Sequence, residues 1–394
     1  MSTPAPPLGG ITVVALEQAV AAPFATRQLA DLGARVIKVE RPGSGDFARH
    51  YDTTVNGEAS YFVWANRSKE SITLDIKQEP ARRAMLRLIR RADVFIYNLA
   101  PGAAARLGLT DLREYQPRLV TCSITGYGEA GPLRSRKAYD LLVQAESGLM
   151  SLTGPEDAPS RVGVSVADIA AGMYAYSGIL AALLARANSG MGAHLDVSLL
   201  DSLSEWLSQP AYYAHYGGSA PPRSGPFHAT IAPYGPIATR SGETLMIGLQ
   251  NEREWRTFCE TVLGDEALTN DPRFDTNSRR VANRDALQEL VQSVFARLTT
   301  AEAVALLERA GIAFSTMRGI SELVRHPQLT ERGRLREVGL PGSSFDSLLP
   351  PVITDGWEYR MDPVPALGAH TTTLLTELGY TEDEIETLRA SKAI

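Results

Sequence analysis

Short apolar segments alternate with helical segments over the first 125 residues, and this alternation narrows the possible folds more than any other feature. Five segments are predicted as buried strands, at residues 11–16, 34–40, 71–76, 93–98 and 118–124. Helical patterns lie between them, as in the small-residue segment 21–33 and the basic segment 80–92. Strands that alternate with helices pair in parallel, and the helices cover both faces of the sheet. The sequence therefore predicts an α/β fold with a mostly parallel, doubly wound sheet.

The texture of the sequence changes after residue 205 and indicates a second domain. Residues 206–225 are rich in Gly, Pro and aromatic side chains and are predicted as a linker. Residues 226–325 combine two short strands about a Ser-Gly turn with three helical patterns, which predicts a smaller α+β domain. The tail, from 331 to 394, has mixed strands and ends in a helix that Thr381 and Glu384 begin as a capping box. Residues 1–205 then form the first part of a larger domain.

Composition excludes several function classes. The chain has 394 residues with a net charge of −6 and no basic stripe, which argues against nucleic acid as a partner. Its two cysteines, Cys122 and Cys259, lie far apart, which argues against a disulfide scaffold and fits a reducing compartment. The first ten residues lack the charged and apolar regions of a secretion signal, so we expect a cytoplasmic protein. The apolar stretch 169–185 falls short of the roughly 20 residues that span a bilayer, so we expect a buried helix and no membrane partner.

The first strand does not lead into a dinucleotide-binding turn. Residues 17–25 contain no glycine, so the G-x-G-x-x-G fingerprint is absent, and the chain has no P-loop. Glu40 ends the second strand where a ribose-binding acid would stand, and residues 43–46, "GSGD", are predicted as a plain surface loop. Six polar or cationic side chains at loops and strand ends are individually expected to be solvated but together suit a large anion with separated phosphates. They are Arg41, Arg49, Lys77, Asn98, Arg106 and Lys137.

No common catalytic or metal-binding motif is present. The six histidines show no metal-ligand spacing, so no metal site is expected, and His228 lies in a loop where a structural role is expected. One acid remains conspicuous: Asp168 heads an apolar run with no other charge until Arg186. A helix N-cap is one interpretation, since Asp is a favoured capping residue. A nucleophile is the other, and the two are compatible.

An aspartate at such a helix start suits nucleophilic chemistry. A model Asp has a pKa of about 3.9, so its carboxylate is ionised at neutral pH and needs no general base. The helix dipole and the free amides of the first turn would hold the anion and stabilise an oxyanion. Small neighbours are expected to leave room for an acyl chain. They are Ala167, Ala170, Ala171 and Gly172.

Several stretches together resemble family III coenzyme A transferases. This group includes formyl-CoA:oxalate and carnitine CoA-transferases and has α-methylacyl-CoA racemase as a sister. The matching pieces occur in order along the chain, among them "LADLGARVIKVERPGSGD" (29–46), "YNLAPGAAARLGL" (97–109), "SITGYGEAGP" (123–132) and "GVSVADIAAGMYAYSGILAAL" (163–183). The first of these and the stretch around Asp168 are specific enough to make a chance match improbable.

The resemblance implies a fold, an assembly and residue roles. It implies a Rossmann-like large domain built from both ends of the chain, with residues 331–394 returning to it, and a small domain inserted between them. It implies that two chains interlock as a homodimer, that Asp168 is the nucleophile, and that coenzyme A or acyl-CoA is a substrate, with no permanently bound cofactor. The resemblance places coenzyme A contacts at Val20, Ala21, Arg41, Leu74 to Lys77, Asn98, Leu99, Ala100, Arg106, Lys137 and Tyr139.

Three functions are compatible with this resemblance. The first is transfer of coenzyme A to a free carboxylic acid through an aspartyl mixed anhydride and an aspartyl–CoA thioester on Asp168. The second is racemisation of a 2-methylacyl-CoA, and the third is acyl-CoA binding without turnover. The racemase relatives place a histidine where this chain has Tyr139, a poor base at pH 7, and a glutamate where it has Asn251, next to Glu252. These departures favour transfer.

The sequence also bears on the substrates. Val20 stands where the formyl-CoA enzyme carries a glutamine, and residues 217–225 have only scattered glycines where that enzyme has a glycine run. Both departures argue against formyl-CoA and oxalate. With the aromatic segment "YYAHY" (212–216), they indicate a larger acyl group, dicarboxylic or branched.

Overall fold

The computed structural model describes residues 5–394, and its contacts divide the chain into two compact units. Unit 1 comprises the described residues up to Ser147, together with Val162–Ser208 and Pro327–Ile394. Unit 2 comprises Gly148–Arg161 and Gln209–His326. Unit 1 is therefore assembled from segments at both ends of the chain.

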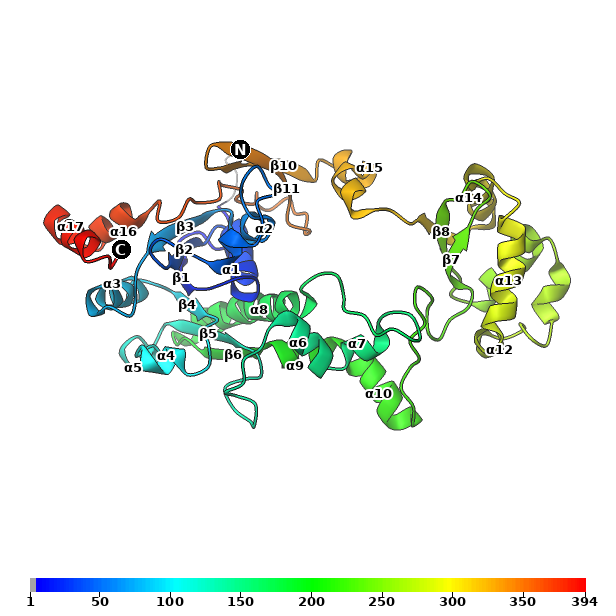
Figure 1. Cartoon of the computed structure of the whole chain (residues 1–394), viewed down its shortest axis with the longest axis horizontal. Coiled ribbons are helices and arrows are strands. Elements are labelled where there is room, and N and C mark those ends of the chain that lie inside the picture. The colour runs from blue at the N-terminus through cyan, green and yellow to red at the C-terminus, as the bar shows by residue number, and fades with distance from the viewer. Residues whose placement is uncertain (1–4) are drawn as a thin grey trace. The chain divides into compact units, whose positions relative to one another are not determined.

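A six-stranded sheet forms the centre of unit 1, in the order β3-β2-β1-β4-β5-β6 with every neighbouring pair parallel (Figure 1). This is the strand order of the doubly wound dinucleotide-binding fold, with its reversal point between β1 and β4. The predicted parallel sheet is thereby confirmed. Its strands are β1 (Thr12–Leu16), β2 (Arg35–Glu40), β3 (Lys69–Thr73), β4 (Val94–Tyr97), β5 (Val120–Thr125) and β6 (His194–Ser198).

Helices cover both faces of this sheet, because most residues of its inner strands are buried on both sides. One face packs against α3 (Glu79–Ile89), α16 (Thr371–Glu377) and α17 (Glu382–Ala390), which share a cluster with β1 to β4. The other face packs against α1 (Ala21–Asp31) and α8 (Val166–Ser189). Helices α16 and α17, at the end of the chain, thus lie beside α3, which is far from them in sequence (Figure 1).

Shorter elements complete unit 1. The predicted capping box at α17 is present, with Thr381 and Glu384 bonded reciprocally. Strands β10 (Leu335–Leu340) and β11 (Ser343–Leu348) form an antiparallel hairpin. The remaining elements are η1 (Phe47–His50), α2 (Ser60–Asn66), α4 (Ala103–Arg106), α5 (Leu112–Tyr115), α6 (Asp140–Glu146), α9 (Leu199–Trp206) and α15 (Pro327–Thr330).

Unit 2 has a three-stranded antiparallel sheet, β7-β8-β9, backed by helices around the buried Trp255 and Phe258. Within the predicted linker 206–225, Ser208–Gly217 forms helix α10. The elements are α7 (Leu149–Leu152), β7 (Tyr234–Ala238), β8 (Thr244–Gly248), α11 (Glu252–Thr257), η2 (Phe258–Leu263), η3 (Glu266–Asn270), α12 (Asn277–Ala282), α13 (Arg284–Phe295), α14 (Thr300–Ala310), β9 (Ala313–Thr316) and η4 (Ile320–Arg325).

Helix α8 is 24 residues long and apolar enough to cross a membrane by length and composition, and the bent pair α13 and α14 passes the same test only as one broken span. In unit 1, however, α8 packs against α1, α9, β5 and β6. The small residues near its start are buried in this packing. Ala167, Ala170, Ala171 and Gly172 are all buried, so the expectation that they leave room for an acyl chain is wrong.

Helix α8 approaches α1 closely at Gly172. A Cβ atom there would lie 2.7 Å from the backbone oxygen of Ala21. We expect Gly172→Ala to push the two helices apart and lower the free energy of unfolding by about 1–3 kcal/mol. Gly178→Ala in the same helix is the matched control, because its Cβ would meet only Leu195 at 3.5 Å. The control should be neutral or slightly stabilising, as Ala is the better helix former. Urea denaturation of both variants measures the difference, and equal stabilities would contradict the packing described.

Candidate active site

The sequence-predicted coenzyme A residues gather at one edge of the sheet. Val20 and Ala21 follow β1, Arg41 follows β2, and the segments 74–77, 98–100 and 137–139 follow β3, β4 and β5. Because all six strands are parallel, these segments emerge at their common carboxyl edge, where doubly wound sheets bind ligands. Arg106 lies slightly farther along the chain, at the end of α4.

Asn98 joins the two strands at the reversal point of the sheet. Its Oδ1 accepts a hydrogen bond from the Gln18 amide at 2.8 Å, and its Nδ2 donates to the Gln18 oxygen at 2.8 Å. The turn after β1 and the turn after β4 are therefore fixed to each other. Asn98 thus has a structural role besides the ligand contact that the sequence suggests.

Four predicted cations remain free for a ligand. Arg41, Lys77, Arg106 and Lys137 are exposed, and none forms an ion pair within residues 5–394. Cations without carboxylate partners suit phosphate oxygens. These side chains belong to the carboxyl edge of the sheet, where helix α8 with Asp168 also begins. No hydrogen bond or ion pair joins them to Asp168 within residues 5–394.

Arg49 and Glu40 are committed to each other. Arg49 binds both Glu40 oxygens at 2.8 Å, and Ser71 donates to the same carboxylate at 2.7 Å. Arg49 is therefore not a solvated cation, and Glu40 is buried and has no oxygen to offer a ribose. This pairing removes the last sign of a nicotinamide site.

Asp168 is the third residue of α8, and Ser165 occupies the N-cap position. The interpretation of Asp168 as a helix cap is therefore wrong: its carboxylate projects from the first turn. No hydrogen bond to this carboxylate occurs among the residues that the structure describes. A half-buried acid without a partner is costly, which is typical of a functional group.

The side chain of Asp140, the first residue of α6, caps the start of α8. Its Oδ1 accepts from the Ala167 amide at 2.8 Å, and its Oδ2 accepts from Gln144 Nε2 at 2.7 Å. The amides of Val166 and Ile169 also have backbone acceptors. Three amides that were expected to serve an oxyanion are thus already bonded, and that expectation is wrong for them.

These surroundings change the acidity of Asp168. Burial, and to a smaller extent the negative charge of Asp140, together raise the pKa of Asp168 to about 7. The expectation of an ordinary carboxylate, ionised well below neutral pH, is therefore wrong. At pH 7 about half of the Asp168 side chains are ionised.

Three tyrosines lie around the start of α8. The Tyr61 hydroxyl is 3.4 Å from Ser165 Oγ. Tyr139 immediately precedes Asp140 and is 70% exposed. Burial raises the pKa of Tyr51, and the charges of Asp46 and Asp168 add to that rise, so Tyr51 lies within the field of both acids. The predicted contacts Ala21 and Tyr139 are thereby brought beside the turn that carries Asp168, together with Tyr51, Tyr61 and Asp140, which the sequence did not reveal.

In unit 2, the two residues at the racemase glutamate position are both engaged. Asn251 caps α11 by accepting from the Glu254 amide at 3.0 Å. Glu252 forms a two-point ion pair with Arg280, at 2.8 and 2.9 Å. Hydrogen bonding to Arg280 lowers the pKa of Glu252, so its carboxylate is held as an anion.

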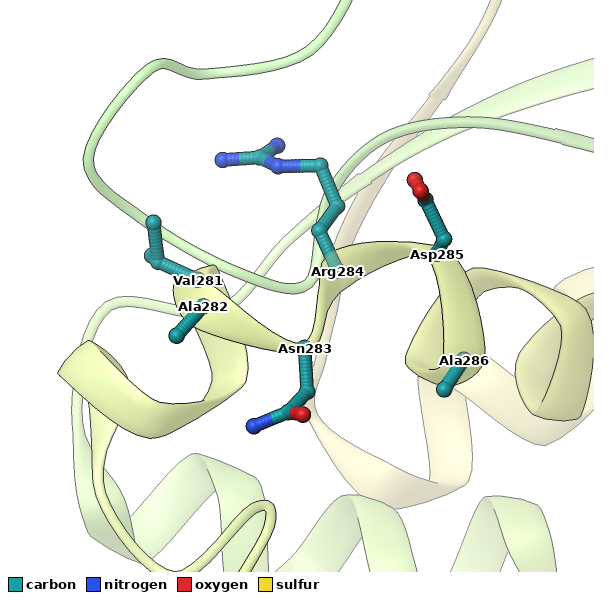
Figure 2. A pocket seen from close by; sticks show the side chains of 6 residues that line it. All are labelled: Val281, Ala282, Asn283, Arg284, Asp285 and Ala286. Atoms are coloured by element: carbon teal, nitrogen blue, oxygen red, sulfur yellow. The ribbon is translucent and has the colours of Figure 1, made fainter.

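A separate pocket in unit 2 contains none of these residues. It has a volume of about 430 Å³ and is lined by the consecutive residues 281–286 at the junction of α12 and α13 (Figure 2). His228 lies a few residues before β7 in the sequence, and its ring stacks on that of Tyr234, the first residue of β7, with ring centres 5.1 Å apart. This stacking agrees with the structural role expected for His228.

Comparison with known proteins identifies the family of this chain. The sequence profile of CoA-transferase family III matches residues 8–371. The chain is 38% identical over 396 residues to succinyl-CoA:glutarate CoA-transferase of Mus musculus, covering 98% of this chain and 90% of that protein. It is 37% identical over 352 residues to acetyl-CoA:oxalate CoA-transferase of Acetobacter aceti, covering 87% of this chain and 90% of that protein.

A solved structure agrees with this result. The crystal structure of a CAIB/BAIF family protein from Brucella suis superposes with a TM-score of 0.83 at 35% identity. The match covers 95% of this chain and 100% of that chain.

Proposed function

The chain belongs to CoA-transferase family III, and we propose that it moves coenzyme A from an acyl-CoA thioester to a dicarboxylic acid through covalent intermediates on Asp168. The family and the named relatives make it a coenzyme A transferase. The observation that supports the proposed nucleophile is the half-buried, unpaired carboxylate at the start of α8, beside Ala21 and Tyr139.

The proposed reaction has four steps. The Asp168 carboxylate attacks the thioester carbonyl, the C–S bond breaks, and a mixed anhydride and the CoA thiolate result. The thiolate attacks the aspartyl carbonyl and releases the donor acid, which leaves an aspartyl–CoA thioester. The acceptor carboxylate attacks that thioester, forming a second anhydride and free thiolate. The thiolate then attacks the acceptor's carbonyl, which yields the new acyl-CoA and restores Asp168.

A dicarboxylic substrate is supported by the relatives. The acceptors named for the mouse and Acetobacter proteins, glutarate and oxalate, are both dicarboxylates. Val20 and the aromatic side chains of Tyr51 and Tyr61 beside the start of α8 favour an acyl chain longer than formyl.

Two features support transfer over racemisation. Racemisation at C2 needs one group to remove a proton and another to return it on the opposite face. Tyr139 stands where the racemase relatives have histidine, and a phenol is a much poorer base than an imidazole at neutral pH. The neighbouring candidates in unit 2 are a capping amide, Asn251, and an ion-paired anion, Glu252.

One experiment separates the two reactions. With succinyl-CoA and glutarate, we expect glutaryl-CoA to form only when both substrates are present. Chromatography of the CoA thioesters measures its formation. With (2R)-2-methylacyl-CoA in deuterated water and no acceptor acid, we expect no deuterium at C2. Deuterium incorporation at a rate comparable with turnover would overturn the transferase mechanism and favour the isomerase.

We also propose that the active form is an interlocked homodimer, as the family resemblance implies. Large apolar side chains that are exposed in the single chain support this, because their burial against a second chain would be favourable. On α8, α9 and α10 these include Leu184, Trp206, Tyr212 and Tyr216, which are 71%, 48%, 62% and 83% exposed. Sedimentation velocity at micromolar concentration should give twice the chain mass, and a monomer would contradict the proposal.

A further inference from the structure

Six charged side chains from β2, the start of β3, and the segments after β1 and β2 form a buried network. Five of them are at most 3% exposed, and the side chain of Arg49 is 10% exposed. Lys38 bridges Asp46 at 2.7 Å and Glu17 at 3.3 Å, while Lys69 binds Glu17 at 2.7 Å. The members are Glu17, Lys38, Glu40, Asp46, Arg49 and Lys69.

Stability alone does not explain this network. Removing charges from water is expensive, and apolar residues of similar volume are often equally stable at such places. Three acids and three bases are buried together here, and each has a partner. The hydrogen bonds that these side chains make to the backbone indicate a further role for the network.

Those bonds hold the turn between β1 and α1. Asp46 Oδ1 accepts from the Ala19 amide at 2.9 Å and from the Ala48 amide at 3.0 Å. Lys69 donates to the Pro23 oxygen at 3.0 Å. The segment between Ala19 and Pro23 is thus fixed at both ends by side chains of the network.

The turn needs such support because Ala19 is strained. Its φ angle is +60°, in the left-handed region that is sterically unfavourable for a residue with a Cβ. A strained backbone persists only where its surroundings determine it, and such residues cluster at functional sites. The amide of Ala19 is held by Asp46, whose charge is in turn balanced by Lys38.

This turn lies beside the proposed nucleophile. Ala21, two residues after Ala19, has its backbone oxygen against Gly172, one helical turn after Asp168. We infer that Asp46 and Lys38 are positioning residues that keep Ala19 left-handed and thereby aim Val20 and Ala21 at the acyl group on Asp168. This inference rests on the proposed function, because Val20 and Ala21 matter only if the thioester reacts there.

Variants of the full-length chain test this role. In Asp46→Asn an amide replaces the oxygen that faces Lys38, and in Ala19→Val a β-branched side chain opposes the left-handed conformation without touching a buried charge. We expect kcat to fall at least tenfold in both, while the Kd for coenzyme A changes by a smaller factor, because the four exposed cations that suit its phosphates are untouched. Ala19→Gly should stay within threefold of wild type in kcat, since glycine adopts this φ freely.

Asp31→Asn is the matched control for losing a buried carboxylate. Asp31 is 1% exposed and pairs with Arg67 at 2.7 Å at the other end of α1. It should lower the Tm, as Asp46→Asn does, and leave kcat within threefold. If Asp46→Asn does not fold, Ala19→Val against Ala19→Gly decides alone. A kcat within threefold of wild type in folded Asp46→Asn or in Ala19→Val would overturn the inference.

Hydrogen exchange separates this inference from the proposed function. Peptides covering residues 17–24 should lose protection at least tenfold in Asp46→Asn and Ala19→Val, while the α3 peptide 79–89 is unchanged. A wild-type chain that transfers no coenzyme A would sink the proposed function, and the exchange measurement would still decide the positioning role. Unchanged exchange at 17–24 in both variants would overturn it.

Discussion

Replacing Asp168 with asparagine is expected to lower coenzyme A transfer by at least about a thousandfold, because the amide cannot form the anhydride. Asp168→Ala should behave alike and cannot regain activity by deamidation. Steady-state assays with succinyl-CoA and glutarate measure the loss. Transfer within tenfold of wild type in Asp168→Ala would show that another group is the nucleophile.

Asp168→Asn should also stabilise the folded chain at neutral and alkaline pH. Burial and Asp140 raise the pKa of Asp168 to about 7, so the folded chain prefers the protonated acid. The stability that comes with protonation is fully present below the unfolded pKa of about 4 and is lost as the pH rises through 7. Asp168→Asn avoids this loss, so its Tm should exceed that of wild type at pH 8 and match it near pH 4. A variant that is less stable than wild type at pH 8 would contradict the unpaired, half-buried carboxylate.

The second large effect is on the pH dependence of acylation. Only ionised Asp168 attacks the thioester, and with a pKa of about 7 the ionised fraction falls from about one half at pH 7 to about one hundredth at pH 5. We therefore expect single-turnover acylation to slow about 50-fold over that interval. An unperturbed aspartate would be almost fully ionised throughout and would give a flat profile.

Asp140→Asn tests the physical cause of this profile. Removing the charge of Asp140 should move the midpoint of the acylation profile to lower pH, and burial, the larger cause, should keep it above the ordinary Asp value. Asparagine can still accept from the Ala167 amide, so the start of α8 is retained. A wild-type midpoint near pH 4, or a midpoint that does not respond to Asp140→Asn, would contradict the electrostatics described for this site.

Much of the sheet is predictable from local pattern, because β1, β2, β4 and β5 are short segments rich in β-branched residues and almost wholly buried. Strand β3 is shifted to Lys69–Thr73 from the predicted 71–76, since the apolar Leu74 and Ile76 continue the pattern after the chain has left the sheet. Strand β6 lies at the edge with alternating exposed residues and was not predicted as a strand. Helix α10 was hidden by its aromatic, glycine-flanked composition.

The site was predictable only in part, for a different reason. Asp168 is visible because it is the single charge at the start of a long apolar helix. Asp140 and Tyr61 act on that helix start across 27 and 104 residues of sequence, and no local pattern signals such contacts. The buried charges of Lys38 and Lys69 stand inside predicted strands or beside them, where only tertiary structure shows that their partners are Glu17 and Asp46.

The most direct test is to find the covalent intermediate on Asp168. Trypsin should release Val162–Arg186, a peptide in which Asp168 is the only acid. After incubation with succinyl-CoA and reduction with borohydride, the aspartyl–CoA thioester should become homoserine, with the corresponding loss of mass at residue 168. Asp168→Ala treated in the same way provides the blank. The proposed mechanism predicts modified peptide in proportion to active enzyme, and an unmodified peptide from a preparation that transfers coenzyme A would contradict it.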